Sequence, residues 1–179
     1  DKEIVQVVAG HPKKAHIEGC KTIDRMYKVA IDKLADVVVV SAGGFPKDIN
    51  VYQAQKALEN AQYAVKAGGT IILAAECPEG AGEEIFQSWM QQASSPDEVL
   101  ERLRQKFVMG GHKAAAIARV LKKAKVILVS SMNEREVSEL FFIPKASLQE
   151  ALKEAIDENG IDCSVLVIPY GGSTLPVLS

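Results

Sequence analysis

The chain has 179 residues, of which 47% are apolar and 25% charged, and its net charge is −2, a profile that excludes a disordered or fibrous protein. No basic cluster indicates nucleic-acid binding, and the longest apolar runs are far shorter than the roughly 18 residues that a membrane span needs. We therefore expect one domain, 1–179, with a substantial core.

Five short apolar runs rich in Val and Ile predict buried strands, because such runs are typical of parallel strands covered on both faces. Helix-period segments separate the runs. This alternation predicts an α/β fold with three layers, in which a mainly parallel, Rossmann-like sheet has helices on both faces. The predicted strands lie at 4–10, 35–44, 69–76, 124–131 and 164–172. The predicted helices lie at 15–34, 50–67, 82–92, 96–106, 112–123 and 146–159.

Two boundaries carry clear local signals. Ser95-Pro96-Asp97 supplies an N-cap residue, a proline at the first helical position and an acid in the first turn, so a helix is expected to begin there. The pair Gly68-Gly69 predicts the end of the helix that begins near Asn50, because glycine tolerates the left-handed conformation of a helix end.

The cysteines and histidines form no recognisable framework. Three cysteines are an odd number without paired spacing, which favours a reducing, cytoplasmic location over a disulfide-bonded one. The three histidines make no zinc-like cluster with them, so no metal site is predicted in this chain. The chain opens on Asp1 without a charged and then apolar leader, and we expect a fragment of a longer protein without a secretory signal.

Ligands of an open α/β sheet bind beyond the carboxyl ends of the strands, where loops lead into helices. All five predicted strands end in loops rich in Gly, Ser or Pro, although such loops also make ordinary turns. The predicted rim consists of residues 10–12, 41–48, 76–82, 130–133 and 170–174.

The loop after the second predicted strand is the most informative part of this rim. It reads SAGGFPKDIN, and Gly43, Gly44, Pro46 and Asp48 are expected to shape one end of a cleft. A glycine-rich turn between a strand and a helix often receives an anion, because free backbone N–H groups and the positive end of the helix dipole meet there. Asp48 or Asn50 can cap the helix that follows.

That helix begins with VYQAQK, so Gln53 and Lys56 lie three residues apart on one face, and Tyr52 lies beside them. A lysine in the first turns is electrostatically unfavourable, because this end of a helix already carries partial positive charge. A bound carboxylate or phosphate would account for Lys56. The competing interpretation is a solvated lysine on an exposed face.

Other residues are weaker candidates. His11 could be an acid, a base or a ligand, and His112 at a helix start could contact a ligand, but both types of residue more often make local hydrogen bonds. Cys77 could be a nucleophile, yet no histidine lies at a catalytic spacing from it, and small buried cysteines are common. Trp89 is expected in the core or in a domain contact.

No nucleotide fingerprint is complete. GGSTLP (171–176) lacks the lysine and spacing of a P-loop and the third glycine of a dinucleotide site. A nucleotide-dependent dehydrogenase, which would carry G-x-G-x-x-G with an acid downstream, is therefore a poor interpretation.

Four segments together resemble a known family. DVVVVSAGGFPKDINVYQAQKAL (36–58), GGTIILAAECPEGAG (68–82), FVMGGHKAAAIARVL (107–121) and VLVIPYGGSTLPVL (165–178) are similar to the C-terminal domain of the nickel-pincer-dependent lactate racemase (LarA-like) family. The resemblance covers essentially the whole chain. GGFPKDINVYQAQK is its most specific part.

The resemblance implies a two-domain racemase or epimerase of 2-hydroxy acids that works by hydride transfer to its cofactor. The cofactor, a nickel-pincer nucleotide, and two proton-acceptor histidines would belong to an N-terminal domain outside these 179 residues, so the isolated chain should be inactive. Gln53 and Lys56 match the family's YQ-x-x-K motif and would bind the substrate carboxylate. Tyr52 and His112 are further candidates for substrate contacts.

One departure bears on the substrate. The family's lactate enzymes place an aromatic residue near the substrate from the region that here reads GGHKAAAIA (110–118), which contains no Trp. A larger or more polar 2-hydroxy acid is therefore an alternative to lactate. An interpretation from another class is a non-catalytic domain of the same fold that binds a small anion.

Overall fold

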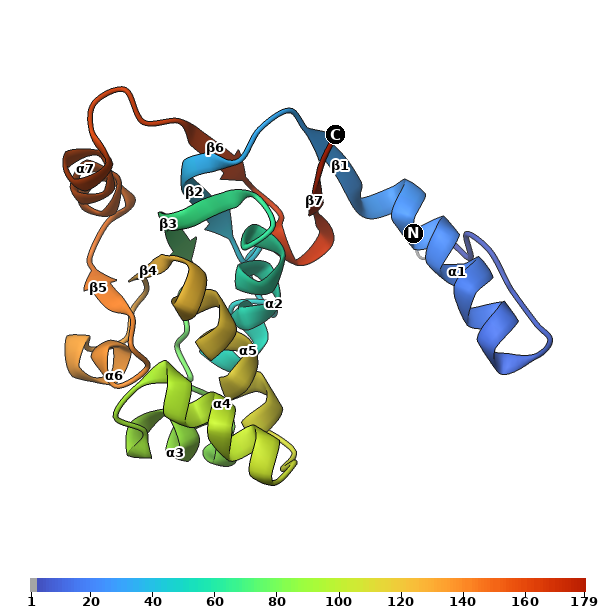
Figure 1. Cartoon of the computed structure of the whole chain (residues 1–179), viewed down its shortest axis with the longest axis horizontal. Coiled ribbons are helices and arrows are strands. Elements are labelled where there is room, and N and C mark those ends of the chain that lie inside the picture. Colours follow the sequence, from blue (N-terminus) through green and yellow to red (C-terminus); the bar gives the residue numbers. More distant parts are fainter. Residues whose placement is uncertain (1–2) are drawn as a thin grey trace.

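A five-stranded sheet forms the centre of the structure, a computed structural model in which residues 3–179 are described (Figure 1). Every neighbouring pair of strands in this sheet is parallel. In spatial order the strands are β5 (Ile143–Lys145), β4 (Lys125–Val129), β3 (Val65–Ala74), β2 (Ala35–Ser41) and β6 (Val165–Ile168).

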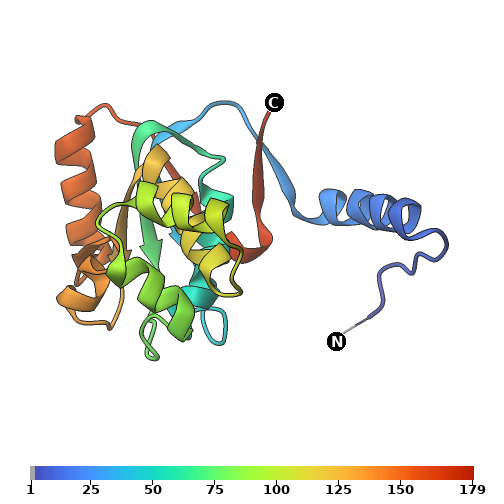
Figure 2. The ribbon, with the colours of Figure 1, turned by 60° about the horizontal axis from the view of Figure 1, so that its bottom comes forward.

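Helices cover both faces of this sheet, which confirms the predicted α/β class (Figure 2). A hydrophobic core lies on each face of the sheet, and alternate side chains of β2 point into one or the other. Val38 and Val40 belong to the larger core, whereas Val37 belongs to the smaller one. The larger core includes residues of α2 (Val51–Ala61), α3 (Glu84–Gln92), α4 (Pro96–Gln105) and α5 (Gly111–Lys123). The smaller core lies under α7 (Leu148–Asn159).

Several short elements were not predicted. The segment after β4 forms α6 (Glu134–Ser138) before β5, and a 3₁₀ turn, η1 (Gly171–Ser173), follows β6. A second, two-stranded parallel sheet joins β1 (Lys28–Ile31) to β7 (Leu175–Leu178). This pairing places the end of β1 beside the C-terminus, since Ile31 lies opposite Leu178 (Figure 1).

The first predicted strand, 4–10, is wrong. Residues 3–9 have no regular secondary structure, and the side chains of Ile4 and Val7 are 81% and 77% exposed. The predicted helix 15–34 is also displaced, since α1 spans Pro12–Tyr27 and the chain then enters β1. Apolar composition alone misled the prediction, because this segment projects from the body and has no sheet to join (Figure 1).

The predicted end of the second helix is wrong as well. The helix α2 ends at Ala61, and both Gly68 and Gly69 lie inside β3. Gly69 is needed for packing, because a Cβ atom there would lie 2.5 Å from the backbone oxygen of Asp36 on the neighbouring strand. Close approach of two strands, and not a helix cap, accounts for this glycine.

Candidate functional site

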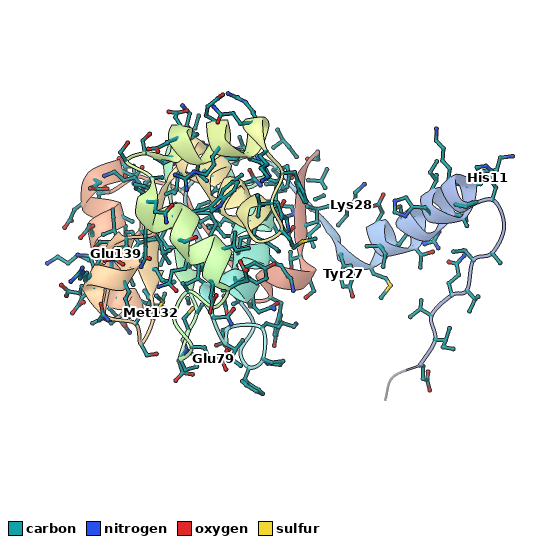
Figure 3. The ribbon with its side chains drawn as sticks, turned by 90° about the horizontal axis from the view of Figure 1, so that it is seen from below. His11, Tyr27, Lys28, Glu79, Met132 and Glu139 are labelled. Carbon is teal, nitrogen blue, oxygen red and sulfur yellow. The ribbon has the colours of Figure 1, made fainter. Side chains whose placement is uncertain are left out.

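The loops that follow the parallel strands meet at one edge of the sheet. Backbone bonds tie them together, since Cys77 N donates to Asp48 O at 2.8 Å and Ser131 N donates to Glu76 O at 2.8 Å. Figure 3 places Glu79 on this edge and His11 at the far tip of the N-terminal segment. The predicted rim therefore loses residues 10–12, and His11 lies away from the loops that form it.

The loop after β2 takes a conformation that requires glycine. Gly43 and Gly44 have φ angles of 97° and 75°, in the left-handed region that other residues rarely adopt. Gly43 N donates to Ser41 Oγ at 3.0 Å, and the Phe45–Pro46 peptide bond is cis. The loop thus turns sharply from β2 toward the start of α2.

Asn50, and not Asp48, caps α2. Its side-chain oxygen accepts a hydrogen bond from Gln53 N at 3.0 Å, and its backbone is extended. Asp48 instead contributes its backbone oxygen to the bond with Cys77. The cap fixes the first turn of α2, which carries Tyr52 and Gln53.

Gln53 and Lys56 are neighbours, as the helix period predicts. Lys56 Nζ donates to Gln53 Oε1 at 2.7 Å, and the lysine is exposed. Both side chains line a cleft of about 280 Å³ whose other walls include Pro46 and Gly172. The structure therefore brings together the helix pair, the glycine-rich loop and the C-terminal GGST segment.

The GGST segment packs tightly against α2. A Cβ atom on Gly171 would lie 2.3 Å from Val40 Cγ2 and 2.6 Å from Ala57 Cβ, so only glycine fits at this position. Asn60 Nδ2 of α2 also donates to Gly171 O at 2.7 Å. These contacts hold Gly172 in the wall of the cleft. The GGST segment thus has a structural role, which its loose likeness to a phosphate loop did not indicate.

Lys113 is a second cation near α2 that the sequence reasoning did not single out. Its Nζ donates to Gln55 Oε1 at 2.8 Å and lies 5.5 Å from the centroid of the Tyr52 ring. Burial, and then the positive charge of Lys56, lower the pKa of Lys113. The sequence signal for Lys113 was its position in the first turn of α5. A lysine there is electrostatically unfavourable for the same reason as Lys56 near the start of α2.

Tyr52 belongs partly to the core. The Tyr52 ring contacts the Phe86 ring edge to face, at a centroid distance of 5.9 Å. Lys113 approaches the same Tyr52 ring. His112 makes a local contact, because its Nδ1 accepts from Gly110 N at 3.2 Å, and its ring lies 5.9 Å from that of Phe107. His112 is not among the residues that line the cleft.

Cys77 and Trp89 are core residues. The side chain of Cys77 is buried, and burial together with Asp48 and Glu76 raises the pKa of its thiol to about 12, so it does not form a nucleophilic thiolate at neutral pH. Trp89 is buried, which confirms the core interpretation. Its ring packs against Gly111 so closely that a Cβ atom on Gly111 would lie 2.7 Å from it.

Neither a metal-binding cluster nor a membrane-spanning helix is present in residues 3–179. No group of three or more His, Cys, Asp or Glu side chains in this range could hold a metal ion, so the residues present do not fit a nickel site. No helix in the described range is long and apolar enough to cross a membrane.

The sequence matches a known family over most of its length. Residues 30–175 match the family described as lactate racemase C-terminal domain. The chain belongs to this family. It is 38% identical over 178 residues to the lactate racemase of Thermoanaerobacterium thermosaccharolyticum and 33% identical over 177 residues to that of Lactiplantibacillus plantarum. These alignments cover 97% and 96% of this chain but only 42% and 41% of the two relatives.

Solved structures give the same fold. The lactate racemase apoprotein of T. thermosaccharolyticum superposes with a TM-score of 0.86 at 36% identity, over 94% of this chain and 41% of that one. A Thermotoga maritima protein superposes with a TM-score of 0.63 at 19% identity, over 93% of this chain and 42% of that one. The second match supports the fold alone.

Proposed function

We propose that this chain is the C-terminal, substrate-binding domain of a two-domain enzyme that racemises or epimerises a 2-hydroxy acid. The observation that carries the proposal is the Gln53–Lys56 pair, which lines a cleft at the start of α2 beside a glycine-rich loop. Membership in the lactate racemase C-terminal family supports the reaction class. The relatives' greater length supports a second domain.

The pair is suited to a carboxylate. Gln53 uses its oxygen to accept from Lys56, which leaves its amide N–H groups as donors, and the lysine ammonium keeps further protons to donate. One carboxylate can therefore accept a charge-assisted bond from Lys56 and a neutral bond from Gln53. The positive end of the α2 dipole favours the same charge.

Holding the carboxylate matters because racemisation passes through a planar intermediate. The hydrogen removed from one face of the α-carbon must be replaced on the other, so the acid has to stay in one orientation in between. The resemblance implies a nickel-pincer nucleotide, which would supply hydride-accepting chemistry from outside this chain. The resemblance assigns the cofactor and the proton-acceptor histidines to the upstream domain, and residues 3–179 offer no group of three or more side chains that could hold a metal ion.

We propose a cytoplasmic location for the same enzyme, supported by the three free cysteines. Lactate is one candidate substrate. A larger or more polar 2-hydroxy acid is the other, because residues 110–118 carry no tryptophan to narrow the pocket.

The test is proton NMR of the full-length, cofactor-loaded enzyme in D₂O with a panel of single-enantiomer 2-hydroxy acids. We expect racemisation of one acid without deuterium at its α-carbon, which also names the substrate. Deuterium incorporation would exclude hydride transfer. No turnover of any acid, combined with saturable binding of a carboxylate to this chain, would favour a non-catalytic anion-binding domain.

A further inference from the structure

The N-terminal arm, residues 3–27, has few buried side chains. It consists of an extended segment that folds back along α1, and both project away from the body (Figures 1 and 3). Gln6 and Thr22 hydrogen-bond across the two parts. Between them lies a hollow of about 690 Å³, lined mainly by apolar side chains that include Ile4, Val5, Val8, Ile23 and Met26.

The two sides of α1 differ in chemistry. Cys20, Ile23 and Met26 line the hollow, whereas Lys21 and Arg25 belong to the opposite side. Ile23 and Met26 are nevertheless 51% and 47% exposed. A 16-residue helix is marginal in water unless its apolar side is packed, and a rimmed apolar patch of this kind indicates a binding surface.

This surface is continuous with the cleft. Ile23 and Asp24 line the hollow and also a second depression, which Asn60 and Gly172 complete. Gly172 in turn lines the cleft of Gln53 and Lys56. A partner protein that filled the hollow would therefore extend along η1 to the mouth of the cleft.

We propose that the hollow of the N-terminal arm is the docking surface for the upstream, cofactor-bearing domain and holds that domain opposite Lys56. This inference rests on the proposed function. The family match begins at residue 30, beyond the arm, whereas the two relatives align over 97% and 96% of the chain, so the arm accompanies the rest of the longer enzymes. The partner that fits presents an apolar segment bordered by charges.

Thiol labelling tests the surface, because Cys20 lines the hollow and Cys163 does not. The full-length protein and the 179-residue chain are treated with a maleimide, and each cysteine is followed by mass spectrometry. We expect Cys20 to react at least about tenfold more slowly in the full-length protein, as for a site that opens only rarely. Partly exposed Cys163 serves as the internal reference. Equal rates at Cys20 would overturn the proposal.

A matched pair of variants identifies the side of α1 that docks. Ile23 and Ile17 are 51% and 48% exposed, but only Ile23 lines the hollow. In the full-length protein, Ile23→Asp should restore fast labelling of Cys20, and Ile17→Asp should leave it slow. Slow labelling in both variants would contradict the assignment.

Three further outcomes separate this inference from its alternatives. A second copy in the hollow would make the 179-residue chain sediment as a dimer that Ile23→Asp dissociates, which would overturn docking of an upstream domain. Fast labelling of Cys20 in an enzyme that racemises its substrate would refute the docking surface but not the proposed function. Slow labelling of Cys20 in a protein that turns over no 2-hydroxy acid would refute the proposed reaction but not the docking surface.

Discussion

The helices α1 and α2 both have an apolar and a polar side, yet the structure treats them differently. Six of the eleven residues of α2 are buried, and its cap residue Asn50 bonds Gln53 N. Only Thr22 of the sixteen residues of α1 is buried, and its cap residue His11 makes no side-chain bond. Amphipathic sequence thus predicts a helix in both places, but among the described residues only α2 has its apolar side packed into a core.

The sharpest test of this comparison removes one apolar side chain from each helix. Leu58 of α2 is fully buried, so Leu58→Ala in the 179-residue chain should lower the free energy of unfolding by about 2–5 kcal/mol through lost burial and a cavity. Ile23→Ala in α1 should change it by less than about 0.5 kcal/mol, as for other exposed positions. Urea unfolding of the two variants measures both, and similar losses would contradict the comparison.

A second prediction concerns the contact of η1 with α2. Gly171→Ala should destabilise the chain by about 1–3 kcal/mol, because the added methyl group overlaps Val40 and Ala57. Gly172→Ala is the matched control, since the nearest atom to its Cβ, Ala42 O, lies 3.9 Å away. Thermal unfolding of both variants provides the measurement. Equal midpoints would mean that this loop does not depend on tight packing.

The third prediction concerns the function of α2. In the full-length enzyme, Lys56→Ala should reduce kcat/KM at least about tenfold, which corresponds to roughly 1.4 kcal/mol for a lost charge-assisted contact. Lys122→Ala, which removes an exposed lysine paired with Asp97, should leave the kinetics unchanged. Unchanged kinetics in the Lys56 variant would refute the carboxylate assignment.

The smallest expected effect concerns pH. The pKa of Lys113 is lowered in the folded chain, so the unfolded chain binds more protons at this site between that lowered value and the ordinary 10.5. Lys113 should therefore contribute stability that increases as pH rises through this window. Lys113→Met should remove that increase, and Lys122→Met should preserve it, in urea unfolding at several pH values. Parallel profiles for wild type and the Lys113 variant would contradict the assigned shift.

Local sequence signals predicted most of the body. Runs rich in Val or Ile marked β2, β3, β4 and β6, because strands of a parallel sheet are covered on both faces and need no polar alternation. Gln53 and Lys56 were predicted as neighbours because the helix period alone decides which residues share a side. The start of α4 at Pro96 followed from its cap residue Ser95.

Long-range contacts decided the rest. Residues 4–10 have the composition of a strand, but a strand also needs a neighbour, and none lies beside the arm in the described structure. Gly69 and Gly171 are glycines because of atoms from other elements, which no local pattern reports.

The sequence by itself determined most of the longer helices and strands of the body and the side-chain pair on α2, since both depend on interactions within a few residues. Only the tertiary structure placed Lys113 beside α2, because its partner Gln55 lies 58 positions away along the chain. Tertiary structure also left α1 without a core to join. Burial depends on which surfaces meet, and that is decided by the whole fold and not by any single segment.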